Sequence, residues 1–171
     1  MRAIVYTSNT GFTKEYAEML GKITDLPVYE INDAKKAIEK GSDIIYLGWL
    51  MAGSVRECKK ICKRYNVKAV CAVGLGETGK LTAQAKKANK IPDSAEAFTL
   101  QGGYAPDKLK GLYKSMMGVA VNAIMKQINS KDELTESDEK MLETLKEGGS
   151  YVCEENLSMI LEWCKEAGIT A

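Results

Sequence analysis

Residues 43–51 read DIIYLGWLM, an almost unbroken apolar run. A run that stays apolar on successive residues is typical of a strand that is buried on both faces of a parallel sheet. Other apolar runs alternate with helical patterns along the rest of the chain. We expect strands at 2–6, 27–31, 43–51, 67–74 and 95–100, and helices at 12–21, 33–40, 55–65, 79–89, 107–128, 136–147 and 155–167.

This alternation of strands and helices constrains the fold class. Strands that are separated by helices pair in parallel, and the helices then cover both faces of the sheet. Because crossovers in such sheets are right-handed, few topologies remain. The sequence contains no repeat and no linker between domains, so we expect one α/β domain over residues 1–171.

Local signals set several helix ends. Asn32 or Asp33 is expected to cap the second helix. The stretch that begins at Thr135 has the form of a capping box, which predicts a helix start there. Gly168 is expected to end the last helix.

Composition excludes several function classes. The chain has 24 Lys and Arg against 23 Asp and Glu, so it has no general basic field that would bind nucleic acid. Histidine is absent, which removes histidine-based metal sites, Ser-His triads and imidazole acid–base catalysis. The five cysteines match no metal or disulfide spacing, and we interpret them as buried or idle thiols in a reducing cytosol. We predict no metal site and identify no catalytic side chain.

Neither the start of the chain nor its apolar runs predict a targeting or membrane segment. The first strand is expected at 2–6, which leaves no room for a signal peptide in this sequence. No apolar run approaches the ~20 residues that are needed to span a bilayer. We therefore expect a cytoplasmic protein without a transmembrane segment.

The tip of the first strand carries an unusual density of hydroxyl groups, on Thr7, Ser8, Thr10 and Thr13. A loop of hydroxyls and free amides before a helix suits an anion, because the helix start offers unpaired N–H groups and a partial positive charge. No charged side chain lies within 7–13, so neutral donors would hold a phosphate monoester. The alternative is a Ser/Thr cap with ordinary turn chemistry.

The stretch Ser8-Asn9-Thr10-Gly11-Phe12-Thr13 resembles the phosphate loop of flavodoxins, Ser/Thr-x-Thr-Gly-x-Thr, in its letters and in its place between the first strand and the first helix. It is neither a nucleotide P-loop nor a Gly-x-Gly-x-x-Gly motif. The resemblance covers residues 1–104. It implies a flavodoxin-like three-layer α/β fold, with a five-stranded parallel sheet in the order 2-1-3-4-5, and noncovalently bound FMN as the cofactor. The helical patterns after the fifth strand add extra C-terminal helices to this fold.

Flavodoxins hold the flavin ring with the loops that follow the third, fourth and fifth strands. The resemblance therefore implies that residues 8–13 bind the phosphate and that the ring is held by Leu50, Met51, Ala52, Gly53, Ser54, Gly74, Leu75, Gly76, Glu77, Thr78, Gly79, Gly102, Gly103 and Tyr104. Glycines in these loops let backbone approach a flat or charged ligand closely. Gly53 matches the family's glycine beside flavin N5, where the peptide changes conformation on reduction.

The aromatic residues depart from the family pattern. Many flavodoxins place a Trp in the first ring loop and a Tyr in the second, whereas this chain has Ala52 and Lys80 at about those positions. Trp49 lies nearer the strand, and two interpretations stay open: a core residue or a stacking one. Tyr104 is the nearest free aromatic residue, and Glu77 is expected to be a solvated carboxylate. A weakly stacked ring implies modest affinity or a ring that is open to a second substrate.

The segment after the fifth strand is longer than in flavodoxins, which end with one helix there. Residues 104–134 form an insertion or extension that combines a broad apolar stripe with lysines, namely Leu109, Leu112, Tyr113, Met116, Ala120, Ala123 and Ile124 with Lys108, Lys110, Lys114 and Lys126. The helix either covers the sheet or faces a partner or a membrane surface through residues 107–127. This layout is similar to that of flavodoxin-type protoporphyrinogen oxidases, which pass electrons to menaquinone.

Three functions remain open. The first expectation is an FMN-dependent oxidoreductase that acts on a quinone, a porphyrinogen or a similar flat substrate. The alternative is a non-enzymatic electron carrier, although carriers of this family are commonly strongly acidic and this chain has a net charge of +1. The third is a member of the fold that binds no flavin and acts through its C-terminal helices.

Overall fold

The computed structural model describes residues 1–169 and divides the chain into two compact units. The first unit is Met1–Gly102 together with Val152–Ala171, of which the part up to residue 169 is described. The second unit is Gly103–Tyr151, so it is inserted between the sheet-forming part of the chain and its C-terminal helix. The predicted extension, 104–134, lies within the second unit, which continues beyond it.

A parallel sheet forms the centre of the first unit. Its strands are β2 (Val28–Glu30), β1 (Ala3–Thr7), β3 (Asp43–Met51), β5 (Asn66–Gly74) and β6 (Glu96–Gln101), in that spatial order. All neighbouring pairs along this path are parallel. The predicted order 2-1-3-4-5 is confirmed, since β5 and β6 are the fourth and fifth parallel strands of the chain. A short antiparallel strand, β4 (Ser54–Val55), pairs with the end of β3.

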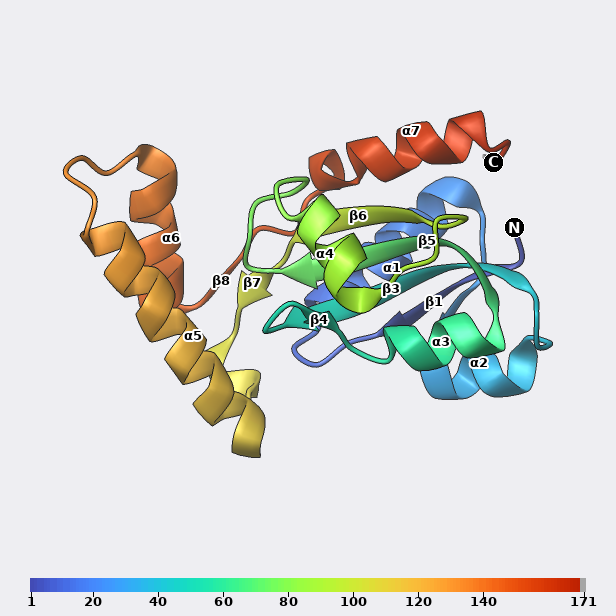
Figure 1. The fold of residues 1–171 in the computed structure, drawn as a ribbon, viewed down its shortest axis with the longest axis horizontal. Coiled ribbons are helices and arrows are strands. Elements are labelled where there is room, and N and C mark those ends of the chain that lie inside the picture. The colour runs from blue at the N-terminus through green and yellow to red at the C-terminus, as the bar shows by residue number, and fades with distance from the viewer. Residues whose placement is uncertain (170–171) are drawn as a thin grey trace. The chain divides into compact units, whose positions relative to one another are not determined.

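Helices cover both faces of this sheet, as predicted. On one face α1 (Phe12–Thr24) and α7 (Ser158–Glu166) pack on the core; on the other lie α2 (Ile31–Ala37), α3 (Cys58–Arg64) and α4 (Thr82–Asn89). Figure 1 shows α7 and the α2–α3 pair on opposite sides of the sheet. Successive residues of β3 alternate between the two cores, because side chains of a strand point to opposite faces: Ile44 joins one cluster and Ile45 the other. The unit therefore has the three-layer flavodoxin-like fold.

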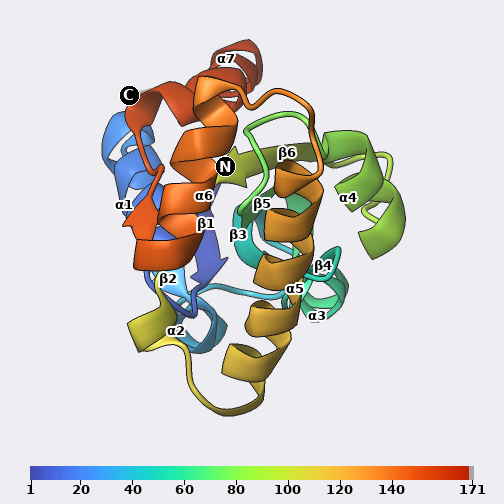
Figure 2. The same cartoon turned by 90° about the vertical axis from the view of Figure 1, so that its left-hand side faces the viewer.

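The second unit is mainly helical. It contains β7 (Gly103–Tyr104), the 3₁₀ turn η1 (Pro106–Lys108), α5 (Gly111–Asn129), α6 (Glu136–Glu147) and β8 (Gly149–Ser150). Helices α5 and α6 contact each other and run side by side (Figure 2). The capping box predicted at Thr135 is confirmed, since its hydroxyl accepts from the Asp138 N–H at 3.2 Å and Asp138 Oδ2 accepts from the Thr135 N–H at 3.1 Å. Strands β7 and β8 are antiparallel, with Gly103 opposite Ser150.

Several of the predicted helix starts are wrong. Helices α4, α5 and α7 begin at Thr82, Gly111 and Ser158 rather than near 79, 107 and 155. The second helix begins at Ile31 with Glu30 as its N-cap, rather than after a cap at Asn32 or Asp33, because Ile31 is already buried against the core. The third helix begins at Cys58 rather than near residue 55, because Ser54 and Val55 pair with β3 instead. The predicted end of α7 is confirmed: Gly168 follows Ala167, the C-cap, at a φ of 67°.

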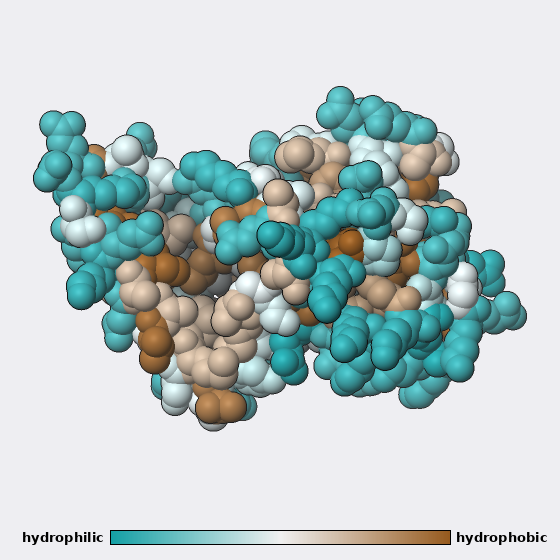
Figure 3. All heavy atoms as spheres, viewed as in Figure 1, coloured by the Kyte–Doolittle hydropathy of each residue, from teal (hydrophilic) through white to brown (hydrophobic). Residues whose placement is uncertain are grey.

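Helix α5 leaves apolar side chains exposed. Leu112 and Val119 are each 73% exposed and Met116 is 42% exposed, whereas Val121 and Ile128 are buried. Figure 3 shows tan and brown spheres along this helix. The helix belongs to the inserted unit, and the two interpretations of the sequence, a helix that covers the sheet or one that faces a partner, both stay predictions. Among residues 1–169, no helix combines the length and the apolar character needed to cross a membrane.

Candidate functional site

The predicted site lies where the carboxyl ends of the parallel strands meet, which is where open α/β sheets bind ligands. The Gly102 N–H donates to the Gly74 carbonyl at 2.7 Å, so the tips of β5 and β6 lie side by side. A Cβ on Gly102 would lie 2.9 Å from Val73 Cγ1 and 3.5 Å from Phe12 Cβ. A Cβ on Gly74 would lie 3.2 Å from Leu50 Cβ. Four of the loops that the sequence singled out therefore converge at one edge.

The loop after β1 turns directly into α1. Gly11 is the N-cap of this helix, with a φ of 109° that favours glycine, and no side chain caps the helix. Its N–H donates to Ser8 Oγ at 3.2 Å, so this amide is not free. Within residues 1–169, no hydrogen bond is found for the N–H groups of Thr10, Phe12 or Thr13. The helix start therefore offers amide donors, as expected at an anion site.

The hydroxyl groups of this loop have different surroundings. The Thr7 hydroxyl is hydrogen-bonded to the hydroxyl of the fully buried Tyr46 at 2.9 Å, so it is already paired within the protein. Burial raises the pKa of Tyr46, which keeps this phenol protonated. Ser8 accepts from Gly11 and still has its own O–H to donate. Thr10 is half-buried, and its hydroxyl has no hydrogen bond within the described chain.

Thr13 carries the most informative hydroxyl. The residue is only 2% exposed, yet no hydrogen bond to its hydroxyl is found within residues 1–169. No side-chain oxygen or nitrogen in this part of the chain is fully buried without a partner. The Thr13 oxygen must therefore be the part of the side chain that stays accessible. A hydroxyl that is nearly buried and unpaired beside free amides is available for a ligand, since such groups otherwise have partners.

The loop after β3 is a β-hairpin, which the sequence did not indicate. Met51 of β3 pairs with Ser54 of β4 across a turn whose central residues, Ala52 and Gly53, have φ values of 46° and 78°. Two positive φ angles are what a two-residue hairpin turn of type I′ requires. Asn89 of α4 holds this hairpin: its side-chain amide donates to the Gly53 carbonyl at 2.9 Å and accepts from the Val55 N–H at 2.7 Å. The Gly53 carbonyl is thus engaged.

Trp49 is a strand residue, opposite Val73 of β5, and it is half-buried. The Arg56 guanidinium lies 5.6 Å from the centre of its ring. A cation over the indole face is favourable, so Trp49 has a structural role without any ligand. This position agrees with the sequence interpretation that Trp49 lies nearer the strand than the stacking Trp of flavodoxins.

A hydrogen-bond network that sequence patterns could not reveal fixes the loop after β5. The Thr78 hydroxyl donates to Asn156 Oδ1 at 2.6 Å and accepts from the Gln101 N–H at 3.0 Å. The Asn156 amide donates to the Tyr16 hydroxyl at 2.7 Å, and Tyr16 in turn donates to the Gln101 carbonyl. Burial raises the pKa of Tyr16 to about 12, which keeps the phenol a donor. The network joins residues that are up to 140 positions apart in the sequence.

The remaining residues that were predicted to hold the flavin ring differ in exposure and in the unit to which they belong. Glu77 pairs with Lys80 at 2.5 Å, and both side chains are partly exposed, which fits the expectation of a solvated carboxylate. Leu75 and Gly76 are half-buried on the same loop. Gly103 and Tyr104 form β7 of the second unit, so the first unit itself supplies no aromatic side chain from the predicted ring loops.

The residues present fit FMN better at its phosphate than at its ring. Free amides, an unpaired Thr13 hydroxyl and the absence of nearby acidic residues in the loop suit a dianionic phosphate. The ring loops offer backbone and aliphatic side chains such as Leu50 and Leu75. Comparison of the chain with protein-family models found no match, and searches of curated proteins and of solved structures found none either.

Proposed function

We propose that the first unit binds FMN noncovalently at the carboxyl edge of its sheet and that the protein is a flavodoxin-like redox protein. The observation that carries this proposal is the open start of α1, where free amides lie beside the unpaired Thr13 hydroxyl. Phosphate would be held by Ser8, Thr10, Thr13 and the amides around Gly11. When bound, FMN would supply the electron transfer, and the protein would supply binding, orientation and electrostatics.

The chain's own residues would orient the ring. Leu50 and Met51 precede the hairpin turn, and Gly74–Gly79 and Gly102 follow β5 and β6, so backbone from three strands would border a flat ligand. The network of Thr78, Asn156 and Tyr16 would hold the second of these loops in place. The hydrogen bond from Asn89 to the Gly53 carbonyl would resist rotation of that peptide.

We expect purified protein to bind FMN with micromolar or tighter affinity and to bind riboflavin at least about tenfold more weakly. Riboflavin lacks only the phosphate, and each hydrogen bond to a charged acceptor is worth about 1.5–3 kcal/mol. Titration of flavin fluorescence against protein measures both constants. Equal affinity for the two flavins would place the phosphate away from the loop at 8–13 and would refute the site proposed for it.

The favoured activity is electron transfer between bound FMN and a flat substrate, in which a porphyrinogen-like substrate would reduce the flavin or a quinone would oxidise it. Simple electron carriage is the alternative. Exposed Leu112, Met116 and Val119 favour the first, because apolar side chains beside lysines suit a flat apolar substrate that carries carboxylates or lies in a membrane surface. The inserted unit begins directly after Gly102, one of the residues proposed for the ring.

Variants of the lysines in the second unit would distinguish an oxidoreductase from an electron carrier. Changing Lys108, Lys110 and Lys114 together to Gln should slow electron transfer from the reduced, FMN-loaded protein to menadione at least about tenfold, or about 1.4 kcal/mol in barrier. Flavin absorbance, recorded under argon, follows the electron transfer. The affinity for FMN should change by less than about tenfold. The matched control changes Lys22, Lys36 and Lys165, exposed lysines of the first unit, to Gln. Equal rates in both triple variants would favour the carrier.

A further inference from the structure

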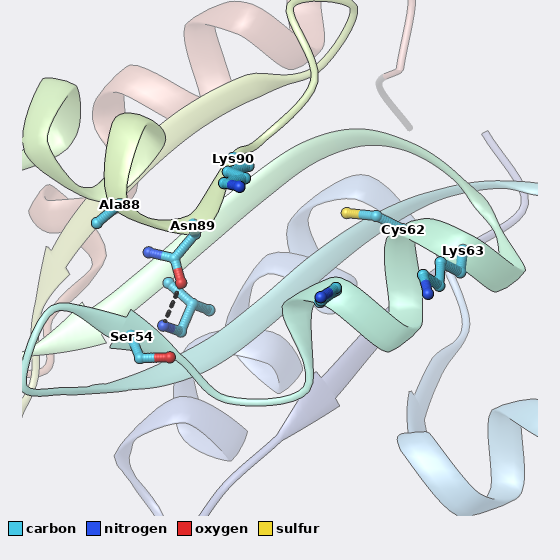
Figure 4. A pocket seen from close by; sticks show the side chains of 8 residues that line it. Ser54, Cys62, Lys63, Ala88, Asn89 and Lys90 are labelled. Carbon is cyan, nitrogen blue, oxygen red and sulfur yellow. Dashed lines mark hydrogen bonds between the residues drawn. The ribbon is translucent and has the colours of Figure 1, made fainter.

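A cavity lies between α3, the hairpin strand β4 and the end of α4, and it shares Ser54 with the loop that follows β3. Its volume is about 410 Å³, which is within the range of small-molecule sites. Figure 4 shows Cys62 and Lys63 extending from α3, with Asn89 and Lys90 at the end of α4. Lys59 and Ser54 also line it, and all of these residues belong to the first unit.

The charge around this cavity is one-sided. Its lining contains Lys59, Lys63 and Lys90 and no acidic residue. Within the described chain none of these three ammonium groups forms a salt bridge, whereas Lys60 on the same helix is paired with Glu57 at 2.8 Å. A hollow lined by charges of one sign concentrates ions of the opposite sign and speeds their association. The cavity therefore favours small anions.

A pair of thiols lies in this basic surrounding. Cys62 is half-buried and lines the cavity, and Cys58 is 2% exposed one turn earlier on α3, with 3.9 Å between the two sulfurs. The hydrogen bond from Cys58 lowers the pKa of Cys62, while the same contact, together with burial, raises the pKa of Cys58. The thiolate is the form of cysteine that attacks disulfides. Cys62 lines the cavity whereas Cys58 is buried, so Cys62 is the sulfur of the pair that a small disulfide can reach.

We propose that Cys62 is a site of reversible thiol–disulfide exchange with a small disulfide that carries carboxylates, which Lys59, Lys63 and Lys90 attract. The Cys62 thiolate attacks one sulfur of the disulfide, a new sulfur–sulfur bond forms, and the old one breaks. The departing thiolate takes up a proton, equal to the one that Cys62 released to solvent. The protein thiol is oxidised to a mixed disulfide, and half of the small disulfide is reduced to a free thiol.

We expect the mixed disulfide on Cys62 to persist. Cys58 should not displace the small thiol to form a disulfide with Cys62. Residues four apart on a helix have Cβ atoms about 5–6 Å apart, whereas a disulfide needs about 3.5–4.5 Å. A bond between Cys58 and Cys62 would therefore require α3 to distort.

The experiment treats the full-length chain with glutathione disulfide, which is anionic, and in parallel with bis(2-hydroxyethyl) disulfide, which is neutral. Peptide mass spectrometry gives the rate of adduct formation at each cysteine, and dithiothreitol should reverse it. Cys153 is an internal comparison, because it is also half-buried but is followed by Glu154 and Glu155. We expect glutathione disulfide to modify Cys62 about tenfold faster than Cys153.

The lysine variants test the recognition step. Changing Lys59, Lys63 and Lys90 to Gln should lower the rate of Cys62 with glutathione disulfide about tenfold and leave its rate with the neutral disulfide nearly unchanged. The control Lys60→Gln alters the same helix outside the cavity. The proposal is overturned if Cys62 reacts no faster than Cys153, or if the triple variant, folded by circular dichroism, keeps the wild-type preference for the anionic disulfide.

Discussion

Replacing Thr13 with valine should weaken FMN binding about ten- to a hundredfold without lowering the free energy of unfolding of the ligand-free protein. The hydroxyl of Thr13 has no partner within residues 1–169, so its loss removes no hydrogen bond from the protein itself. A hydrogen bond to a charged phosphate is worth about 1.5–3 kcal/mol, which corresponds to that range of affinity. Fluorescence titration gives the affinity, and urea unfolding gives the stability.

Thr24→Val is the matched control, since it makes the same change elsewhere on α1. Thr24 is also buried, but its hydroxyl donates to the Leu20 carbonyl at 2.7 Å. This variant should lose about 0.5–1.5 kcal/mol of stability and keep its FMN affinity. The opposite pattern, with Thr13→Val unstable and its FMN affinity unchanged, would mean that the Thr13 hydroxyl serves the fold and not a ligand.

Ile160→Ala should cost about 2–5 kcal/mol of unfolding free energy, the largest effect on stability that we predict. Ile160 lies on α7, is fully buried, and belongs to the core that α7 shares with α1 and one face of the sheet. Truncating it removes buried surface and leaves a cavity. Because α7 follows the inserted unit in the chain, the result also measures how strongly the C-terminal helix completes the first unit. Urea unfolding at equilibrium gives the change.

The neighbouring residue supplies the control for this prediction. Met159 is 51% exposed on the same helix, so Met159→Ala should change stability by less than about 0.5 kcal/mol. A loss for Ile160→Ala as small as that for Met159→Ala would show that α7 is not packed as described.

The sequence was sufficient for the fold because the burial pattern of its strands is distinctive. The run at 43–51 is apolar on successive residues, and the structure buries its two alternating sets in two separate cores. Capping signals predicted two helix ends correctly, the start of α6 at Thr135 and the end of α7 at Gly168. They failed at Asn32, where burial of Ile31 outweighs the preference of a side chain for a cap position.

The candidate site was predicted as a set of loops but not as a set of contacts. Convergence of the loops follows from the parallel sheet, so residues 8–13, 50–54, 74–79 and Gly102 could be grouped from the sequence. The hairpin turn at Ala52 could not, because alanine rarely adopts a positive φ and gives no turn signal. Asn89 and Asn156 lie far along the chain from the loops they hold, and no local pattern marks such side chains.

The pairing of β7 with β8 has a consequence for how this protein could be remodelled. The chain leaves the first unit after Gly102 and returns to it at Val152, and the residues just inside these points, Gly103 and Ser150, are opposite each other on antiparallel strands. Their Cα atoms are therefore about 5 Å apart. A few flexible residues would close that gap. The helical segment between β7 and β8 could therefore be shortened, exchanged or moved to another protein without changing the connectivity of the sheet.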